Sequence, residues 1–177
     1  MKRILIVVDM QNDFVTGALR NEEAIKIVPS VVKRVERAEA AGERIIFTRD
    51  THYADYMDTE EGKNLPVPHC IKDTEGWEII PQLKGFSENA ETYDKPVFGS
   101  LKLGEDLSRI PDKDVTIELI GLCTDICVIS NAVIARAACP DAHIAVDASC
   151  CAGVTPESHK TALEAMKVFQ VEIINEV

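Results

Sequence analysis

Short apolar runs alternate with segments of helical periodicity along this chain, and that alternation restricts the possible folds more than any other feature. The first two runs, RILIVV at 3–8 and RIIFT at 44–48, are rich in the branched residues that strands favour. Apolar residues between them recur at the spacing of one helix face; they are Val28, Val31, Val32, Val35 and Ala38. The pattern predicts a β-α-β unit in which Gly42 ends the helix and Pro29 is tolerated if it lies in the first turn.

The remainder of the chain continues this alternation. Further strands are predicted at 114–121, 142–147 and 171–174, with a shorter one near 90–94, and helices near 102–110, 125–138 and 156–169. Thr155 is the expected N-cap of the last helix because Pro156 follows it. Parallel strands need crossover connections that cover both sheet faces, so the expected fold class is α/β, with a parallel sheet between two layers of helices.

Length and composition indicate a single domain over residues 1–177. A chain of 177 residues with 46% hydrophobic residues can bury one core, and no repeat, low-complexity tract or linker divides it. Residues 49–89 show no clear period, and irregular segments of that length are usually functional or lid-like. The six cysteines begin only at Cys70, and without an export signal they are expected to be free thiols packed as small apolar residues.

Charge and hydropathy exclude two classes of partner. A net charge of −11 with only 19 Lys and Arg residues leaves no basic surface for nucleic acid. The N-terminal apolar run is too short for a signal peptide or a membrane span, and no later run reaches about 18 apolar residues. The chain is therefore predicted to be cytoplasmic and to bind a small molecule rather than nucleic acid or a membrane.

Reactive side chains follow the predicted strands at their carboxyl ends, where ligands bind in open α/β sheets. These side chains are Asp9, Asp50, His52, Lys95, Asp147 and, beyond a turn, Cys127. Any one of them alone has the simpler interpretation of a turn former or helix cap. Because the strand ends would bring all of them to one edge of the sheet, we predict a functional site there.

Cys127 is the candidate nucleophile of this site. It lies about one turn into the predicted helix at 125–138, where the helix dipole and a positive charge on Lys95 would lower the pKa of a thiol. Asp9 could take the thiol proton and return it to a leaving amine, and backbone N–H groups of the turn could hold an oxyanion. The alternative is a structural cysteine above a capped helix.

Asp50 and His52, with His69 downstream, form a candidate metal site. A carboxylate and two imidazoles suit a divalent ion such as zinc and leave positions open for water or substrate. Glu60, Glu61 or water could supply a fourth ligand. The acidic run that contains the two glutamates has the simpler interpretation of a solvated loop, and Asp-x-His pairs are common in loops.

Three motifs, in this order, resemble those of the isochorismatase-like cysteine hydrolases, a family that includes nicotinamidases and related amidases. They are VVDMQNDF in the first strand and its turn, DKPVFGS with Lys95, and GLCTDICV. The resemblance covers nearly the whole chain and implies a mainly parallel, six-stranded sheet with helices on both faces. It places the catalytic triad of the family on Asp9, Lys95 and Cys127.

The resemblance also implies details of the pocket. The Leu122–Cys123 peptide bond would be cis, and the backbone N–H groups of Cys123 and Cys127 would form the oxyanion hole. Phe14 would form one aromatic wall. Zinc or a similar ion would bind the candidate metal site and polarise the pyridine nitrogen of the substrate, and relatives are commonly dimers or tetramers, so a homo-oligomer is expected.

We therefore expect an amidase that hydrolyses a small amide through a thioester on Cys127, with nicotinamide as the leading substrate. The segment NLPVPH, which ends at His69, lacks the second aromatic wall common in nicotinamidases, although Trp77 and Tyr53 are candidates for it. A carbamoyl or ureido amidase is an open alternative, whereas the isochorismatase branch works without a cysteine nucleophile. A non-catalytic binding protein, and a redox or metal-cluster role for Cys123 and Cys127, are the hypotheses outside this chemistry.

Several other reactive residues are not assigned to the site. His143 and His159 are expected at ordinary surface or core positions. Cys70 would point away from the metal if its segment is extended. Cys150 and Cys151 follow the fifth predicted strand and could line the pocket or a subunit interface.

Overall fold

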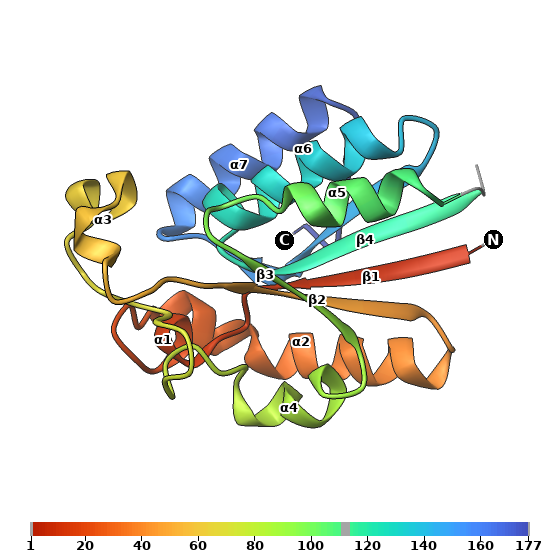
Figure 1. Ribbon diagram of the computed structural model, residues 1–177. Helices are drawn as coiled ribbons and strands as arrows, with labels where there is room; N and C mark the ends of the chain where they lie inside the picture. Colours follow the sequence, from red (N-terminus) through yellow and green to blue (C-terminus); the bar gives the residue numbers. More distant parts are fainter. Residues whose placement is uncertain (1, 111–113, 177) are drawn as a thin grey trace.

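A computed structural model, which describes residues 2–110 and 114–176, shows a six-stranded sheet (Figure 1). The strands lie in the order β3-β2-β1-β4-β5-β6 and are β1 (Lys2–Val8), β2 (Arg44–Asp50), β3 (Glu91–Lys95), β4 (Val115–Leu122), β5 (His143–Ala152) and β6 (Glu172–Ile174). Each pairs in parallel with its neighbours. The predicted α/β class and the six strands, including the short one near 90–94, are confirmed.

Helices cover both faces of this sheet, as predicted. One face carries α1 (Asn12–Val15), α2 (Glu22–Ala40) and α4 (Pro81–Ser87), and the other carries α5 (Leu101–Ser108), α6 (Ile129–Ala138) and α7 (Pro156–Val168). Side chains alternate along each strand and so divide the core in two. In β1, Ile4 and Ile6 pack towards α5, α6 and α7, whereas Leu5 and Val7 pack towards α2.

The segment 49–89 is largely irregular, as predicted, but it contains three short helices. Besides α4, these are a 3₁₀ turn at Tyr56–Asp58 and α3 at Glu60–Asn64. In Figure 1 the yellow α3 stands off the body of the molecule, on the side where the carboxyl ends of the strands lie. Its position beside those strand ends brings this segment to the predicted site.

The predicted end of α2 and start of α7 are confirmed, but the predicted place of Pro29 is not. Gly42, with a φ of +68°, follows the end of α2, and Thr155 caps α7 by accepting a hydrogen bond from a backbone N–H of the first turn. The α2 helix begins at Glu22, with Asn21 as its N-cap. Pro29 therefore lies in the helix interior, and the expectation that it lies in the first turn is wrong.

The β5 strand is longer than predicted, which changes the place of three residues. It continues to Ala152, so Cys150 and Cys151 lie inside the strand and are buried on opposite faces of the sheet. Neither lines the cavity described below. Asp147 lies in mid-strand and accepts hydrogen bonds from two polar side chains there, so the prediction that it joins the site is wrong.

A buried ion pair joins α2 to the sheet. The guanidinium group of Arg34, which is 7% exposed, donates hydrogen bonds of 2.7 and 2.8 Å to the two carboxylate oxygens of Glu118 in β4. Loss of Arg34 would leave the buried Glu118 carboxylate with a longer contact of 3.5 Å to the partly exposed Arg3 guanidinium group. We expect Arg34→Met to lower the free energy of unfolding in urea by about 3 kcal/mol. Arg44→Met, which breaks a more exposed pair with Glu91, should change it by less than about 1 kcal/mol; equal losses would contradict this account.

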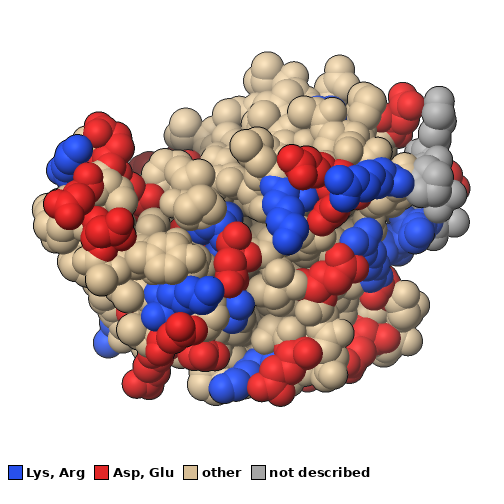
Figure 2. All heavy atoms as spheres, in the orientation of Figure 1, with Lys and Arg blue, Asp and Glu red and all other residues tan. Residues whose placement is uncertain are grey.

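Charged side chains of both signs are mixed on the face of the molecule drawn in Figure 2. On the face drawn in Figure 2, Lys and Arg side chains lie among Asp and Glu side chains and form no continuous basic area. Among the described residues, no helix combines the length and the apolar character that a membrane span requires. Neither observation indicates a nucleic-acid or membrane partner.

Candidate active site and metal centre

The carboxyl ends of four strands meet at one edge of the sheet and bring the predicted reactive side chains together. The direction of strand order reverses between β1 and β4, the point where ligands bind in doubly wound sheets. Asp9 follows β1, Asp50 and Lys95 end β2 and β3, and Cys127 lies in the turn after β4. A cavity of about 990 Å³ opens at this edge and is lined by Asp50 and Cys127 among others.

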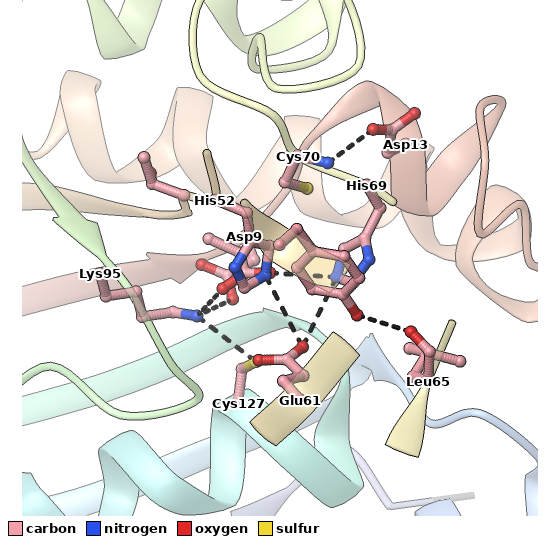
Figure 3. A network of polar contacts seen from close by, with 12 residues as sticks. Asp9, Asp13, His52, Glu61, Leu65, His69, Cys70, Lys95 and Cys127 are labelled. Carbon is pink, nitrogen blue, oxygen red and sulfur yellow. Dashed lines mark hydrogen bonds and ion pairs between the residues drawn. The ribbon is translucent and has the colours of Figure 1, made fainter. Parts of the chain in front are cut away.

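Lys95 contacts both of the other predicted catalytic side chains (Figure 3). Its Nζ lies 2.6 Å from Asp9 Oδ2, 3.5 Å from Cys127 Sγ and 3.3 Å from Asp50 Oδ1. Asp9 Oδ1 accepts a 2.7 Å hydrogen bond from the Thr48 hydroxyl. Asp9, Lys95 and Cys127 are 0, 1 and 6% exposed, so their charges interact with little screening by water.

Burial and neighbouring charges together shift the pKa values of these groups. Burial and the negative charge of Asp9 raise the pKa of Cys127 well above its usual value, and Lys95 offsets only part of that rise. Burial also raises the pKa of Asp9 despite the ammonium group beside it. For Lys95, burial alone would lower the pKa, but the surrounding acidic groups raise it. The lowered thiol pKa predicted from the helix start is therefore wrong, because burial outweighs the charge of Lys95.

The turn that carries Cys127 differs from the predicted helix. A π-helical turn, Thr124–Val128, precedes α6, which begins only at Ile129. The side-chain amide of Asn131 donates a 2.8 Å hydrogen bond to the Cys127 carbonyl oxygen. Single π turns occur often at functional sites, and this one places the Cys127 thiol within reach of Lys95.

The start of this turn packs tightly against β1. Gly121 has a φ of +115°, and a Cβ atom there would overlap the carbonyl oxygen of Val8. Only glycine combines this conformation with so close an approach. The next peptide bond, Leu122–Cys123, is cis, as the resemblance implied.

Four side chains form a compact metal-type cluster beside the triad. Asp50, His52, Glu61 and His69 offer ligand atoms that all lie within 4.8 Å of one another. The Nε2 atoms of the two histidines lie 2.9 and 3.4 Å from Asp50 Oδ2 and 3.6 and 3.7 Å from Glu61 Oε1. His69 Nδ1 lies 2.8 Å from the Val67 carbonyl oxygen, which orients Nε2 towards the cluster. The three predicted ligands are thus brought together.

Glu61 is the glutamate that reaches this cluster. Its side chain is 15% exposed, whereas that of Glu60 is 87% exposed, so the solvated-loop interpretation is wrong for Glu61. Among the described residues, Glu61 Oε2 has no hydrogen-bond partner. Burial and the nearby Asp50 carboxylate raise the pKa of Glu61. A divalent cation would relieve that repulsion and satisfy the unpaired oxygen, so this set of donors fits one.

Tyr56 packs against the metal-type cluster and was missed by sequence reasoning. Its buried ring packs against His52 and His69, with centroid distances of 4.7 and 5.1 Å. Its hydroxyl donates a 2.8 Å hydrogen bond to the Leu65 carbonyl oxygen. Because the residue lies in a segment without periodicity, no local signal predicts its burial.

Phe14 lines the cavity, as the resemblance implied. Its ring lies edge-on to that of His69, with a centroid distance of 5.8 Å. Leu65 and Phe98 also line the cavity. Sequence reasoning did not identify these two wall residues, which come from the segment before His69 and from the loop after β3.

The two candidates for a second aromatic wall lie outside the cavity. Trp77 is buried, and its indole N–H donates a 2.9 Å hydrogen bond to the Thr51 hydroxyl. Tyr53 is 56% exposed. Neither lines the cavity, so that prediction is wrong for both residues.

The remaining cysteines and histidines named in the sequence analysis lie outside the triad and the metal-type cluster. Cys123 lines the cavity. Cys70 has a φ of +45°, so its segment is not extended there, but its thiol is not part of the metal-type cluster. His143 is exposed and pairs with a glutamate, and the half-buried His159 bonds to the Thr124 hydroxyl. As predicted, neither histidine lines the cavity.

Known proteins share this fold over nearly their whole length. Pyrazinamidase of Pyrococcus horikoshii, solved in complex with zinc, is 28% identical with a TM-score of 0.83, over 99% of this chain and 100% of that one. N-carbamoylsarcosine amidase of Thermoplasma acidophilum is 26% identical with a TM-score of 0.79, over 100% and 99%. The nicotinamidase of Schizosaccharomyces pombe is 27% identical over 208 residues, 97% of this chain and 92% of that one.

A family-level match covers almost all of the sequence. Residues 3–175 match the Isochorismatase domain. The match includes all three motifs and every residue of the site described above. The chain therefore belongs to the isochorismatase family.

Proposed function

We propose that this protein is a cysteine amidohydrolase that converts nicotinamide to nicotinate and ammonia. The observation that carries the proposal is the contact of Lys95 with Asp9 and Cys127, beside a metal-type cluster at the same cavity. Acyl transfer needs a nucleophile and a group that moves its proton. A pyrazinamidase and a nicotinamidase among the relatives support an amide on a nitrogen-containing ring.

In the first half-reaction, Cys127 Sγ attacks the amide carbon and its proton passes to Asp9. The raised pKa of Asp9 makes this carboxylate a better proton acceptor than a solvated one. Lys95 Nζ, 3.5 Å from Sγ, stabilises the negative charge as it forms on sulfur. Asp9 then gives the proton to the amide nitrogen, so ammonia leaves and a thioester remains.

In the second half-reaction, water attacks the thioester. Asp9 takes a proton from that water and returns it to the departing sulfur, which releases the carboxylic acid and restores the thiol. The backbone N–H groups of Cys123 and Cys127 are proposed to bind the oxyanion in both steps. In this proposal, Cys123 contributes its backbone N–H, and its thiol takes no part in the reaction.

We propose zinc as the resident ion, held by Asp50, His52, Glu61 and His69. Bound there, it would supply a Lewis acid for the ring nitrogen of the substrate. The unpaired Glu61 oxygen and the convergent imidazole nitrogens support this assignment. Phe14 offers an apolar face to a ring held in the cavity.

Glu61 and Glu60 provide a matched pair to test the ligand set. Glu61→Gln removes a charged ligand, so we expect the variant protein to bind Zn²⁺ about tenfold or more weakly than the parent. Glu60→Gln alters an exposed neighbour and should leave the affinity unchanged. Competition with a chromophoric chelator measures both values, and equal affinities of the two variants would rule out Glu61 as a ligand.

The substrate is tested by ammonia release from nicotinamide, pyrazinamide and N-carbamoylsarcosine. We expect the highest kcat/KM with nicotinamide. A carbamoyl amidase is the second candidate, because one relative has that activity and the residue near His69 that lines the cavity is Leu65, not an aromatic residue. A higher kcat/KM with the carbamoyl compound would select this alternative.

We also propose a cytoplasmic homo-oligomer, a dimer or a tetramer. Leu101 and Val133, on the neighbouring helices α5 and α6, are 77 and 49% exposed. Exposed apolar side chains of this kind are common at subunit contacts. Light scattering of the purified protein would show a monomer if this proposal is wrong.

A further inference from the structure

The carboxylate of Asp13 is held between two segments that are far apart in the sequence. Its Oδ2 accepts a 2.7 Å hydrogen bond from the Cys70 N–H (Figure 3), and its Oδ1 accepts a 3.0 Å bond from the Ala18 N–H. Gly17 and Gly76 pack so closely that a Cβ atom on either would overlap this side chain. The structure therefore leaves room for one position of the carboxylate.

That position matters because Cys70 directly follows the proposed metal ligand His69. At Cys70 the backbone has a φ of +45°, which non-glycine residues adopt only when surrounding contacts hold them. The hydrogen bond that the Cys70 N–H donates to Asp13 is such a contact, and it spans 57 residues of sequence. It anchors the peptide that carries the His69 imidazole.

Gln11 makes the corresponding contact with the ligand on β2. It is fully buried, and its Oε1 accepts a 2.7 Å hydrogen bond from the Asp50 N–H. Its Nε2 donates bonds of 2.8 and 2.9 Å to the carbonyl oxygens of Asp50 and Trp77. One amide thus satisfies both backbone groups of Asp50 and ties that residue to the loop before α4.

We propose that Gln11 and Asp13 are positioning residues of the metal site, which hold the backbones of Asp50 and His69 so that their side chains converge. The inference rests on the metal site proposed above and adds that the turn after β1 organises ligands supplied by two other segments. Metal affinity depends on such outer contacts because ligands that are already in place lose little freedom on binding. Neither residue touches the ligand atoms themselves.

Asn12, between the two, is the matched control. Its side-chain amide also reaches across to the irregular segment, where it donates a 2.7 Å hydrogen bond to the Glu75 carbonyl oxygen. Glu75 is not adjacent to a proposed ligand. Asn12→Ala therefore removes a contact of the same kind from the same turn and leaves the two ligand contacts in place.

The test compares the Zn²⁺ affinities of the folded proteins by competition with a chromophoric chelator. Asp13→Asn has only one acceptor oxygen for two N–H groups, so we expect a loss of about 10-fold to 100-fold in affinity. Asn12→Ala should stay within about twofold of the parent. Gln11→Glu, which turns a donor into an acceptor facing two carbonyl oxygens, should lose affinity as Asp13→Asn does.

A second pair of variants tests the position of Asp13 without changing that residue. Gly76→Ala would place a Cβ atom on the Asp13 carboxylate and displace it, whereas Gly85→Ala meets nothing within 4 Å. We expect only Gly76→Ala to lose Zn²⁺ affinity. This pair decides the question if Asp13→Asn does not fold, which urea unfolding of the metal-free proteins would show.

The experiments distinguish a wrong positioning role from a wrong metal site. If the parent protein does not bind Zn²⁺, both are overturned. If the parent binds but Asp13→Asn and Gly76→Ala bind equally well, the metal site stands and the positioning role is wrong. A purely structural role would lower the stability of the metal-free protein and leave the affinity of the folded protein unchanged.

Discussion

A Cys127→Ala variant is expected to release no ammonia from nicotinamide, with a fall in kcat of about 10⁴-fold or more. Alanine has no atom that can attack the carbonyl carbon, and the described triad offers no second nucleophile at this place. Loss of a small, 94% buried side chain should leave the fold intact. An enzyme-coupled assay for ammonia, run beside circular dichroism of the variant, measures both effects.

Cys123→Ser is the control for this variant. The proposed contribution of Cys123 is its backbone N–H, which serine retains, so most of the activity should remain. If the two thiols formed a redox or metal-binding pair, the two variants would be equally impaired. If the protein were a binder without chemistry, the parent would release no ammonia and Cys127→Ala would bind the same ligand as tightly.

An Asp9→Asn variant is expected to lose about 10²-fold to 10⁴-fold in kcat, the usual contribution of a general acid–base. Asparagine cannot accept the thiol proton or deliver it to the leaving nitrogen. It also removes the carboxylate that lies 2.6 Å from Lys95, although Asp50 remains 3.3 Å away as a partner for that ammonium group. Single-turnover kinetics with nicotinamide would locate the loss in formation of the thioester.

The KM value separates this role from a structural one. Asp9 does not line the cavity, so KM for nicotinamide should change little while kcat falls. A variant that keeps more than a tenth of the parental kcat would show that another group moves the proton. A large rise in KM with an unchanged kcat would assign Asp9 to the shape of the pocket instead.

Much of the fold followed from local patterns. The branched runs before Asp9 and Asp50 became β1 and β2, and the Thr155–Pro156 pair began α7, because strand and cap preferences depend on neighbouring residues. The predictions that failed depend on contacts between segments that are far apart in the sequence. The length of β5, and with it the burial of Asp147 inside the strand, depends on pairing with β4 and β6.

The site residues likewise divide into those that local sequence predicted and those that only distant contacts determine. Asp50, His52 and His69 were predicted as ligands from residue type, order and resemblance, and the structure brings them together. The choice between Glu60 and Glu61 needed the orientation of α3, which exposes one side chain and buries the other. Local sequence contains no signal for that choice, because both residues are glutamates in the first turn of a short helix.

By itself, the sequence determined the order of strands and helices in the chain and which chemical groups follow each strand, since both depend on residue type and short-range periodicity. Tertiary structure decided the direction in which the pKa of the Cys127 thiol shifts, the walls of the cavity and the contacts of Gln11 and Asp13. These properties depend on burial and on neighbours from remote segments. The thiol shows the reason most clearly: a helix start and a lysine favour a lower pKa, but burial beside Asp9 raises it.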